Sequence, residues 1–455
     1  MKKIVIIGGC AAGPKAAAKS KRLNPNNIVQ LYTKENIVSY SACGLPYFIS
    51  GVVPNINHLI VRTPEEFEQQ GVEVYLNHTL TKINPDKKTV IFNHIKEVEY
   101  DELILCVGSY PYSPNIRNFN LKNVFHLKVI EDGVNIKNLA ITSKTVLLIG
   151  AGYIAIELLE AFVENNLKII VVEKSKKVLP ILDDEISQAI LNRILENSKG
   201  LIEFIFEDEV VEFIGEDKFQ GAITKNGKRI EADFCVVAVG VKPNVDIAKE
   251  AGVEIGVTGA IKVDNKMRTS IPNIFAAGDC TEEIFIPTKQ SVYLALGTIA
   301  NKQGRVAAIN VNSDFTGKSE TFDGILGSMI TKFFNYSIAA TGISEEKANE
   351  LKKYINIYPI STTVDEYDKA GYMPEIGFLK VKLVADKITG EILGAQIVGT
   401  GDAHKRIGIV ASILKAKLTV NEFLHLDLPY APPFSSTIDP LLTCAYKLKQ
   451  LIETW

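Results

Sequence analysis

Residues 4–13 of the chain, IVIIGGCAAG, join a continuous apolar run to a glycine turn. Four apolar residues without alternation are typical of a strand buried in a parallel sheet. Pro14 then opens an alanine-rich helix through Leu23, and proline costs little in a first helical turn. This order predicts a phosphate-cradling turn, in which backbone N–H groups and the helix N-terminus face a pyrophosphate. Because Cys10 replaces the second glycine of the usual fingerprint, a purely structural glycine turn is the alternative.

The same pattern recurs at residues 146–155, VLLIGAGYIA, which makes it far more specific. A second strand, residues 169–172, follows and ends at Glu173. An acidic residue at this point accepts hydrogen bonds from a ribose 2′-hydroxyl and repels a 2′-phosphate. The second unit should therefore prefer NADH. The lysine-rich stretch 174–177, KSKK, could hold a phosphate, so NADPH stays possible.

Each unit closes with an apolar strand and a glycine, at residues 103–108 and 234–240. Two nested copies of one fold are implied, and the chain is predicted to be α/β. Cys106 and Cys235 lie inside these strands, where core packing explains them better than chemistry does.

Length and composition set the outer bounds. The chain has 455 residues, 46% of them hydrophobic, which is enough for two to four domains. Its 50 basic and 53 acidic residues give a net charge of −3, so we expect no nucleic-acid or membrane partner. No apolar run is long enough to span a membrane, and residues 4–7 are too short for the core of a signal peptide. We therefore expect a cytoplasmic protein.

The six cysteines are widely spaced, since even the closest two, Cys10 and Cys43, are 33 residues apart. This spacing excludes a compact zinc site and a CxxC or CxxxxC dithiol, so we expect no metal. A redox-active cysteine would have to find its second sulfur on a substrate or share its electrons with a cofactor.

Cys43 is the strongest candidate for such a cysteine. It lies in residues 39–47, SYSACGLPY, where Gly44 and Pro46 follow the thiol. A thiol in this position would lie near the N-terminal end of a short helix, where the dipole and free N–H groups favour the thiolate. A buried structural cysteine is the alternative.

Residues 39–47 resemble the active-site segment of the one-cysteine class of pyridine nucleotide-disulfide oxidoreductases, and most closely that of the coenzyme A-disulfide reductases. Residues 269–279, TSIPNIFAAGD, resemble the flavoprotein segment that presents a glycine and an aspartate to FAD. Residues 300–305 match a helix near the flavin, and residues 428–436 match the C-terminal signature of the class. The resemblance covers essentially the whole chain.

The resemblance implies two nested Rossmann-like dinucleotide-binding domains, for FAD and NAD, followed by a C-terminal α+β dimerisation domain. The implied divisions are 1–112 (FAD, first part), 113–145 (connection), 146–257 (NAD(P)), 258–320 (FAD, second part) and 321–455 (dimerisation domain). In the last of these we expect strands near 325–330, 378–384 and 392–398, and helices at 344–353 and 404–417.

The resemblance also implies roles for individual residues. The cofactor-binding residues are Gly8, Gly9, Cys10, Ala11, Ala12, Gly13, Thr33, Lys34, Cys106, Gly108, Gly278 and Asp279 for FAD, and Gly150, Gly152, Tyr153, Ile154, Glu157, Glu173 and Gly240 for the nicotinamide coenzyme. The coenzyme A site would be lined by Lys15, Lys19, Arg22, Ser39, Ala42 and Asn301. The catalytic residues would be Cys43, Tyr430 and, as a second tyrosine, Tyr372.

The spacing of three basic residues supports the coenzyme A site independently. Lys15, Lys19 and Arg22 stand at i, i+4 and i+7, so they form one stripe of the first helix. Such a stripe suits a ligand with several phosphates. The alternative is a solvated helix face.

Three positions depart from the family pattern. Thr33 stands where an acidic residue usually binds the FAD ribose, although Glu35 is close. Ala42 replaces an asparagine that commonly contacts the substrate. Ala11 replaces the histidine of the peroxidase and oxidase relatives, which disfavours peroxide cleavage.

The resulting expectation is an FAD-dependent NAD(P)H oxidoreductase. It would reduce coenzyme A disulfide, or a related low-molecular-weight disulfide or persulfide, through a mixed disulfide on Cys43. Tyr430 would protonate the departing thiolate in a homodimer with shared active sites. The alternatives are a water-forming NADH oxidase that works through a sulfenic acid on Cys43, and an electron-transfer flavoprotein subunit of a larger complex.

Overall fold

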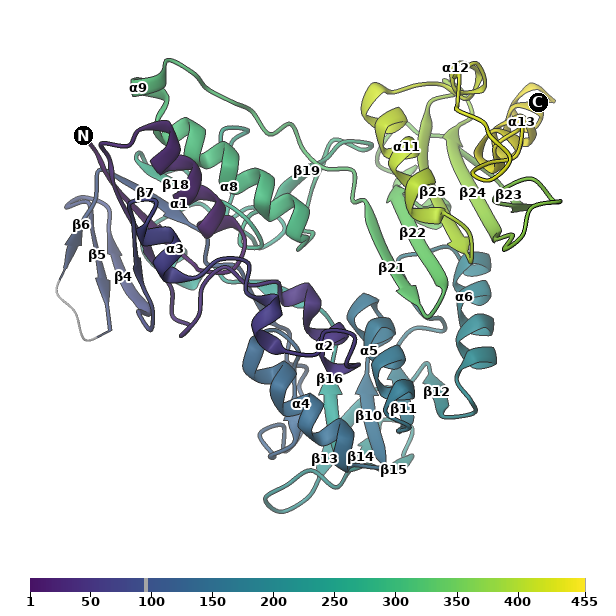
Figure 1. The fold of residues 1–455 in the computed structure, drawn as a ribbon, viewed down its shortest axis with the longest axis horizontal. Coiled ribbons are helices and arrows are strands. Elements are labelled where there is room, and N and C mark those ends of the chain that lie inside the picture. The colour runs from purple at the N-terminus through teal and green to yellow at the C-terminus, as the bar shows by residue number, and fades with distance from the viewer. Residues whose placement is uncertain (94–96, 455) are drawn as a thin grey trace.

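The computed structural model describes residues 1–93 and 97–454. Its first unit is a parallel sheet in the strand order β18-β7-β1-β2-β3. These strands are β1 Lys3–Ile7, β2 Ile28–Tyr32, β3 Val72–Tyr75, β7 Glu102–Leu105 and β18 Ile274–Ala276. Helices α1 (Ala12–Leu23) and α8 (Gly297–Val311) pack together beside it, and Figure 1 shows them at the upper left. Helix α1 begins two residues before Pro14, which lies in its first turn as expected.

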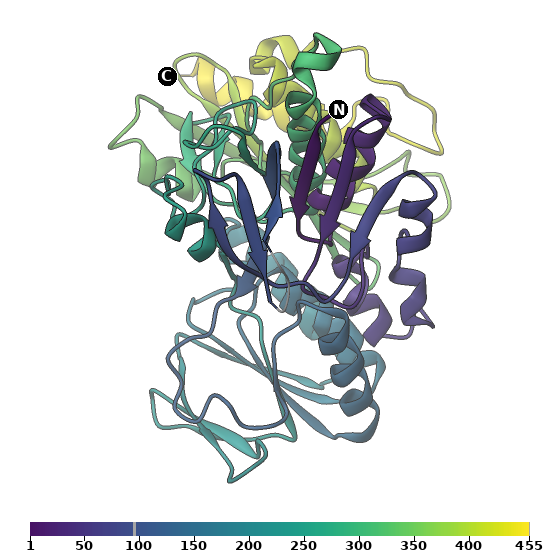
Figure 2. The same cartoon turned by 90° about the vertical axis from the view of Figure 1, so that its left-hand side faces the viewer.

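The second unit repeats this arrangement. Its sheet has the order β12-β11-β10-β16-β9, also parallel throughout. The strands are β9 Val124–Phe125, β10 Thr145–Ile149, β11 Lys168–Glu173, β12 Ile202–Phe206 and β16 Phe234–Val237. Its helices are α4 Ile130–Thr142, α5 Tyr153–Glu164 and α6 Asp184–Asn197. The expected pair of nested Rossmann-like folds is confirmed, with β10, β11, β12 and β16 in the places of β1, β2, β3 and β7. Figure 2 shows the second unit below the first.

Each unit also carries an antiparallel three-stranded sheet before its closing parallel strand. These sheets consist of β4 Leu80–Asn84, β5 Thr89–Phe92 and β6 Val98–Glu99 in the first unit, and β13 Val210–Ile214, β14 Gly221–Thr224 and β15 Arg229–Glu231 in the second. Two further pairs of strands are β8 Ser109–Pro111 with β17 Val241–Pro243, and β19 Glu283–Phe285 with β20 Gln290–Val292. The short helices are α2 Leu45–Ile49, α3 Pro64–Glu68, α7 Asp246–Glu250 and α9 Ser313–Thr316.

The C-terminal domain is an antiparallel sheet in the order β21-β22-β25-β24-β23, covered by helices. Its strands are β21 Met329–Phe333, β22 Tyr336–Gly342, β23 Pro359–Tyr367, β24 Phe378–Asp386 and β25 Ile392–Gly399. Its helices are α10 Glu345–Leu351, α11 Ala403–Ala416, α12 Val420–Leu424 and α13 Pro440–Glu453. The strand expected near residues 325–330 begins several residues later, at Met329 of β21, and Ile325 makes only an isolated bridge to Phe285. The expectations at β24, β25, α10 and α11 are confirmed.

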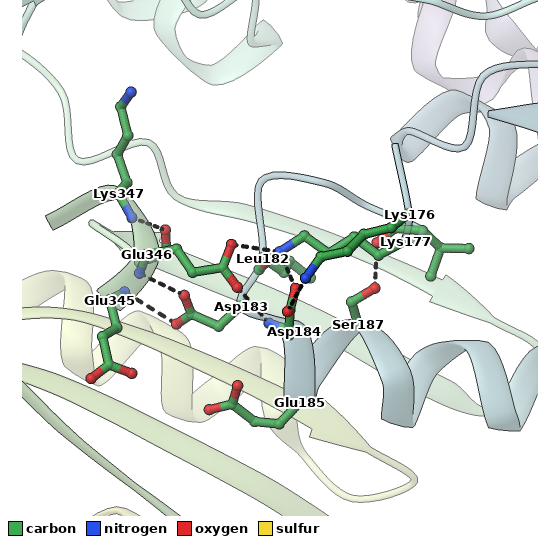
Figure 3. A network of polar contacts seen from close by, with 12 residues as sticks. Lys176, Lys177, Leu182, Asp183, Asp184, Glu185, Ser187, Glu345, Glu346 and Lys347 are labelled. Carbon is green, nitrogen blue, oxygen red and sulfur yellow. Dashed lines mark hydrogen bonds and ion pairs between the residues drawn. The ribbon is translucent and has the colours of Figure 1, made fainter. Parts of the chain in front are cut away.

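A buried charge network joins the second unit to this C-terminal sheet. The Lys382 side chain is only 2% exposed and lies 3.0 Å from Asp183, 2.5 Å from Glu185 and 2.9 Å from Glu345. Asp183, at the start of α6, also accepts hydrogen bonds from the backbone N–H groups of Glu345 and Glu346 at the start of α10 (Figure 3). The two parts are therefore held together by a buried ion pair, Lys382 with Asp183, to which the partly exposed Glu185 and Glu345 add further negative charge.

Within the described part of the chain, no helix combines the length and the apolar character that crossing a membrane requires.

Candidate redox site

Cys43 lies in a single 3₁₀ turn, Ala42–Gly44, which runs directly into α2. Among the six cysteines, all of them within the described residues and free, it alone is exposed. Cys10 is partly buried, and the others are buried: Cys106, Cys235, Cys280 and Cys444. Gly44 allows the turn to sit close to its neighbour, since a Cβ atom there would lie 2.4 Å from a methyl carbon of Leu59. The structure thus presents one thiol that a substrate can reach.

The expected preference for the thiolate at Cys43 is wrong for the protein without ligands. The thiol is open to solvent on one side, but desolvation by the surrounding protein raises its pKa, and so do the charges of Glu157 and Asp279. Lys128 acts in the opposite direction. A helix as short as α2 does not outweigh these effects.

The first glycine turn is tightly packed against the structure around it. Gly8 has a φ of +118°, and a Cβ atom there would lie 2.0 Å from the carbonyl oxygen of Cys106. A Cβ at Gly9 would lie 2.7 Å from the Thr33 side chain, and one at Gly13 would lie 1.9 Å from the carbonyl oxygen of Gly8. Only glycine fits these positions without movement of the backbone.

The redox segment begins on this turn. The backbone N–H of Ser39 donates to the carbonyl oxygen of Gly9 at 2.6 Å, and Ser39 itself has a φ of +53°. The Sγ of Cys10 lies 3.6 Å from the carbonyl oxygen of Tyr40. These contacts hold the first glycine turn and the segment that carries Cys43 next to each other.

Gly278 and Asp279 follow β18 at the same end of the sheet. The Gly278 N–H donates to Gln303 Oε1 on α8 at 2.7 Å. The Asp279 carboxylate accepts a hydrogen bond from Ser109 Oγ at 3.1 Å and lies 3.5 Å from Lys128 Nζ. Gly278 lies beside the helix that follows the first glycine turn, since a Cβ atom there would be 3.1 Å from the Cβ atom of Ala12.

Glu283 lies beneath this segment and was not predicted to be functional. Burial raises its pKa to about 8, so the carboxyl group is mostly protonated at neutral pH. Gln303 Nε2 is 3.4 Å from Glu283 Oε1, whereas Oε2 is buried with no hydrogen-bond partner. No signal in the sequence distinguishes this residue from the other acids near it.

The first unit fits FAD on two grounds. Because Gly8, Gly9 and Gly13 have no side chains, the backbone of this turn can approach a pyrophosphate closely. In addition, Glu35 Oε2 is buried without a hydrogen-bond partner. Thr33 Oγ1 accepts a hydrogen bond from the Glu35 N–H at 3.3 Å, so Thr33 shapes the turn that carries Glu35. Glu35 can therefore take over the role of the acidic residue that usually binds the FAD ribose at the position of Thr33.

The second glycine turn is more open. Gly150 has a φ of +97°, and a Cβ atom there would lie 2.7 Å from the carbonyl oxygen of Ala238. A Cβ at Gly152 would meet nothing within 4 Å. The buried Glu173 carboxylate accepts hydrogen bonds from the backbone N–H groups of Ala151 and Ser175, each at 2.7 Å. Each oxygen keeps capacity for a further hydrogen bond, so Glu173 can shape the turn and bind a ribose.

Three predicted coenzyme residues lie in the first two turns of α5. The Tyr153 hydroxyl is buried and has no hydrogen-bond partner. Ile154 is exposed. Glu157 accepts a hydrogen bond from Thr331 on β21 at 3.0 Å, and desolvation raises its pKa. An open glycine turn followed by an orphaned hydroxyl and a desolvated acid fits a nicotinamide coenzyme.

The lysines after Glu173 are already paired. Lys174 lies 3.2 Å from Glu209, and Lys176 lies 2.5 Å from Asp184. Lys177 lies 2.6 Å from Glu346 and 2.9 Å from Asp184 (Figure 3). Its side chain is 12% exposed, whereas that of Lys174 is 77% exposed. Lys174 is therefore the lysine whose ion pair would need the least free energy to break if a 2′-phosphate bound here.

The basic stripe on α1 has no partners of its own. Lys15, Lys19 and Arg22 make no hydrogen bond or ion pair with any described residue, although Lys21 on the same helix donates to the carbonyl oxygen of Asn27 at 2.7 Å. Asn301 is exposed on α8. The stripe thus offers uncompensated positive charge to a ligand.

The two predicted tyrosines meet on the C-terminal domain. Partial desolvation and hydrogen bonding to Tyr430 raise the pKa of Tyr372. Tyr372 is 74% exposed and Tyr430 48% exposed. No hydrogen bond between described residues joins either of them to the Cys43 segment, and Figure 1 shows α2 well apart from α12 and α13.

Within residues 1–93 and 97–454, no three His, Cys, Asp or Glu side chains gather as a metal site.

The sequence did not predict Lys128 as a site residue, because its contacts are with Ser109 nearby and with Asp279 far along the chain.

Known proteins match almost the full length of the chain. The sequence profile of the pyridine nucleotide-disulphide oxidoreductases matches residues 2–304, and that of their dimerisation domain matches residues 328–441. An NAD(P)H sulfur oxidoreductase (CoA-dependent) from Pyrococcus furiosus is 34% identical over 98% of this chain and 99% of its own. A coenzyme A disulfide reductase from Staphylococcus aureus is 31% identical over 99% and 100%. The structure of an NAD-dependent persulfide reductase from A. fulgidus has a TM-score of 0.94 and 31% identity, covering 99% of this chain and 84% of that one.

Proposed function

Because the chain belongs to the pyridine nucleotide-disulphide oxidoreductase family, we propose that it uses NAD(P)H to reduce a low-molecular-weight disulfide or persulfide of coenzyme A. The observation that carries this proposal is the single exposed thiol of Cys43, while the other described cysteines are buried or partly buried. The relatives from Pyrococcus furiosus and Staphylococcus aureus are named for reactions of sulfur compounds and carry coenzyme A in their names, which supports the same substrate class.

The chain's own residues supply binding and sulfur chemistry. The first glycine turn, Glu35 and Asp279 would hold FAD, and the second turn with Glu173 would hold the nicotinamide coenzyme. When bound, FAD relays two electrons from NAD(P)H to the sulfur atoms. The Cys43 thiolate attacks one sulfur of the substrate disulfide and forms a mixed disulfide, and the other half leaves as a thiolate. Two electrons then cleave the mixed disulfide and restore Cys43.

The basic stripe of α1 would bind the phosphates of coenzyme A. Lys15, Lys19 and Arg22 have no partner among the described residues, so no ion pair with these residues has to be broken when an anion binds. Ser39, Ala42 and Asn301 would complete the site. Charge reversal at Lys19 and Arg22 should raise the KM for coenzyme A disulfide about tenfold or more. Lys21→Glu on the same helix is the matched control and should leave this KM nearly unchanged.

We further propose that two subunits complete each other's sites. The dimerisation domain of the family is present, and Tyr372 and Tyr430 of this domain are exposed and make no hydrogen bond to the Cys43 segment among the described residues. Tyr430 of the partner subunit would protonate the departing thiolate. Mixing Cys43→Ser with Tyr430→Phe subunits gives heterodimers with one intact site, so activity should partly recover. Absence of recovery after verified subunit exchange would contradict shared sites.

The decisive experiment is anaerobic NADH oxidation with coenzyme A disulfide, coenzyme A persulfide, cystine and glutathione disulfide, beside an assay with oxygen alone. Cys43→Ser should abolish turnover of the coenzyme A substrates while NADH-to-dye electron transfer stays largely intact. Disulfide turnover in this variant would overturn the mechanism. Oxygen reduction to water as the fastest reaction would instead identify an NADH oxidase.

A further inference from the structure

Arg62, just before α3, differs from most arginines of the chain in having no carboxylate partner. The sequence contains eight arginines, all of them within the described residues. Six of them form an ion pair with an Asp or Glu side chain, namely Arg117, Arg193, Arg229, Arg268, Arg305 and Arg406. The two without such a pair among the described residues are Arg62 and Arg22, and Arg22 already belongs to the basic stripe of α1. Arg62 is therefore a second guanidinium whose charge is not compensated.

An aromatic ring holds the Arg62 side chain in place. Its guanidinium carbon lies 5.0 Å from the centre of the buried Phe67 ring. The guanidinium makes one polar contact with the described residues, from Nη1 to Gln70 Oε1 at 3.5 Å. A guanidinium stacked on a ring keeps the donors at its edge free, and it loses little side-chain freedom when it binds an anion. Arg62 is thus ordered before any ligand binds.

The acids next to Arg62 are engaged at the start of α3. Glu66 Oε2 accepts a hydrogen bond from the Thr63 N–H at 2.8 Å, and Thr63 Oγ1 accepts one from the Glu66 N–H at 3.4 Å. Hydrogen bonding to Thr63 also lowers the pKa of Glu65. Both carboxylates therefore stabilise the first turn of the helix, and neither neutralises Arg62.

The segment that ends at Arg62 runs antiparallel to the segment that leads to Cys43. Close to the redox turn, the Ser41 N–H donates to the carbonyl oxygen of Leu59 at 2.8 Å. Farther from the turn, the carbonyl oxygen of Ser39 accepts from the Arg62 N–H at 3.3 Å. Three residues of extended chain span about 10 Å, which is roughly the separation of Arg62 from Leu59. A ligand that contacts both Cys43 and Arg62 must therefore be long.

Arg62 also lies on the side of α1 that carries the redox segment. Phe67, beneath the guanidinium, belongs to the buried cluster that contains residues 16–18 of α1. The Ser39 N–H donates to the carbonyl oxygen of Gly9, in the glycine turn before α1, while the Ser39 carbonyl oxygen binds the Arg62 N–H. Arg62 therefore adds positive charge from a second element to that of the basic stripe.

We propose that Arg62 is a specificity-determining residue, whose guanidinium binds a phosphate group of the coenzyme A substrate. This inference rests on the proposed function, in which Cys43 attacks a disulfide or persulfide of coenzyme A. Coenzyme A carries its phosphates at the far end of a long arm from its sulfur, which matches the separation of Arg62 from the redox turn. The planar guanidinium can bind a phosphate through two parallel hydrogen bonds.

The test is anaerobic NADH oxidation by the flavin-loaded enzyme with two substrates, coenzyme A disulfide and pantethine, which is the disulfide of the same arm without phosphates. Arg62→Met keeps an apolar cover over Phe67 and removes the charge. It should raise the KM for coenzyme A disulfide about tenfold and leave that for pantethine within about twofold. Arg62→Lys keeps the charge but not the planar fork of donors, so it should recover part of the loss.

Arg193→Met is the matched control. Arg193 also lies over an aromatic ring, 5.8 Å from the centre of Tyr336, but it pairs with Glu196 in the second unit. It should leave both KM values unchanged. Flavin absorbance per protein and the urea midpoint check that each variant is folded, and Arg62→Lys carries the comparison if Arg62→Met loses its flavin.

Two outcomes would overturn the proposal for Arg62 alone. One is a wild-type KM for coenzyme A disulfide in Arg62→Met, and the other is an equal rise in the KM for pantethine, which would show a structural role. A wild-type enzyme that does not prefer coenzyme A disulfide to pantethine would instead overturn the coenzyme A assignment, and the role of Arg62 with it. The preference of the wild type thus separates failure of the proposed function from failure of this inference.

Discussion

The two glycine turns have the same topology but differ in how much room they leave. In the first, Cβ atoms at Gly8 and Gly13 would lie within 2.0 and 1.9 Å of backbone carbonyl oxygens. In the second, the nearest such approach, at Gly150, is 2.7 Å, and Gly152, whose place in the first turn is taken by Cys10, faces open space. At the matched glycines, Gly8 and Gly150, the first, closed turn is therefore more tightly packed than the second, open turn.

This difference corresponds to two kinds of ligand. A closed turn suits a group that stays bound and becomes part of the core, as we propose for FAD. An open turn suits a coenzyme that must enter and leave in each catalytic cycle. The same strand, glycine turn and helix can serve both uses because only the surroundings of the turn have changed.

The largest expected effect is on the closed turn. Gly8→Ala should destabilise the protein by about 4 kcal/mol and abolish flavin retention, because the new methyl group meets backbone at a positive φ. Gly152→Ala should leave the urea midpoint and the flavin content close to those of the wild type. Flavin absorbance per protein and urea unfolding measure both. Equal losses in the two variants would show that the turns do not differ.

The second prediction concerns pH and the buried acid of the first unit. The pKa of Glu283 is raised from 4.5 to about 8, so the folded state holds a proton that the unfolded state releases. Stability from this group is full below pH 4.5 and is lost as pH rises towards 8, on the order of 5 kcal/mol in all. Glu283→Gln should remove this dependence between pH 5.5 and 8.5 in urea unfolding. An unchanged slope would rule out Glu283 as its source.

A smaller effect is expected at the open turn. Lys174→Ala should raise the KM for NADPH about tenfold and leave that for NADH within about twofold, because an exposed lysine can leave a weak surface pair for a 2′-phosphate. Lys225→Ala is the control, since Lys225 pairs with the same Glu209 at 3.3 Å. Parallel changes in the KM for both coenzymes would show that Lys174 does not discriminate between them.

The smallest expected effect is that of Glu157 on the reactivity of Cys43. Glu157 belongs to the second unit but raises the pKa of Cys43. Glu157→Gln should therefore speed alkylation of Cys43 by iodoacetamide at pH 7.5 about twofold to threefold, because loss of a nearby carboxylate lowers the pKa of the thiol. Site-resolved mass analysis measures the rate. A slower reaction would mean that Glu157 acts through packing and not through charge.

The sequence predicts the two parallel sheets well, for a physical reason. Strands such as β1 and β10 are buried on both faces, so they read as continuous apolar runs that end at a glycine. The C-terminal sheet is harder to predict. The edge strand β23 has mostly half-buried side chains and was missed, as were β22 and the long helix α13. Half-buried strands lack the apolar contrast from which such elements are recognised.

The residues of the candidate site also differ in how well the sequence predicts them. Residues in local motifs, such as Gly8, Gly150 and Cys43, could be predicted because their chemistry is written in adjacent residues. Lys128 and Glu283 could not, because what matters about them is a neighbour far along the chain or the depth of burial. The direction of the Cys43 pKa was missed for this reason, since it depends first on desolvation by the surrounding protein and then on charges from separate parts of the chain.

The buried network around Lys382 limits how freely the parts of this protein can be exchanged. Topology suggests that the second unit is a cassette, which could be replaced by that of a relative with a different coenzyme preference. Asp183 and Glu185 travel with that cassette, while Lys382 stays behind with Glu345. A donor without acids at these two positions would leave a buried ammonium group short of counter-charge, at a cost of several kcal/mol. Chimaeras should therefore be built with the recipient's Asp183 and Glu185 grafted into the donor segment.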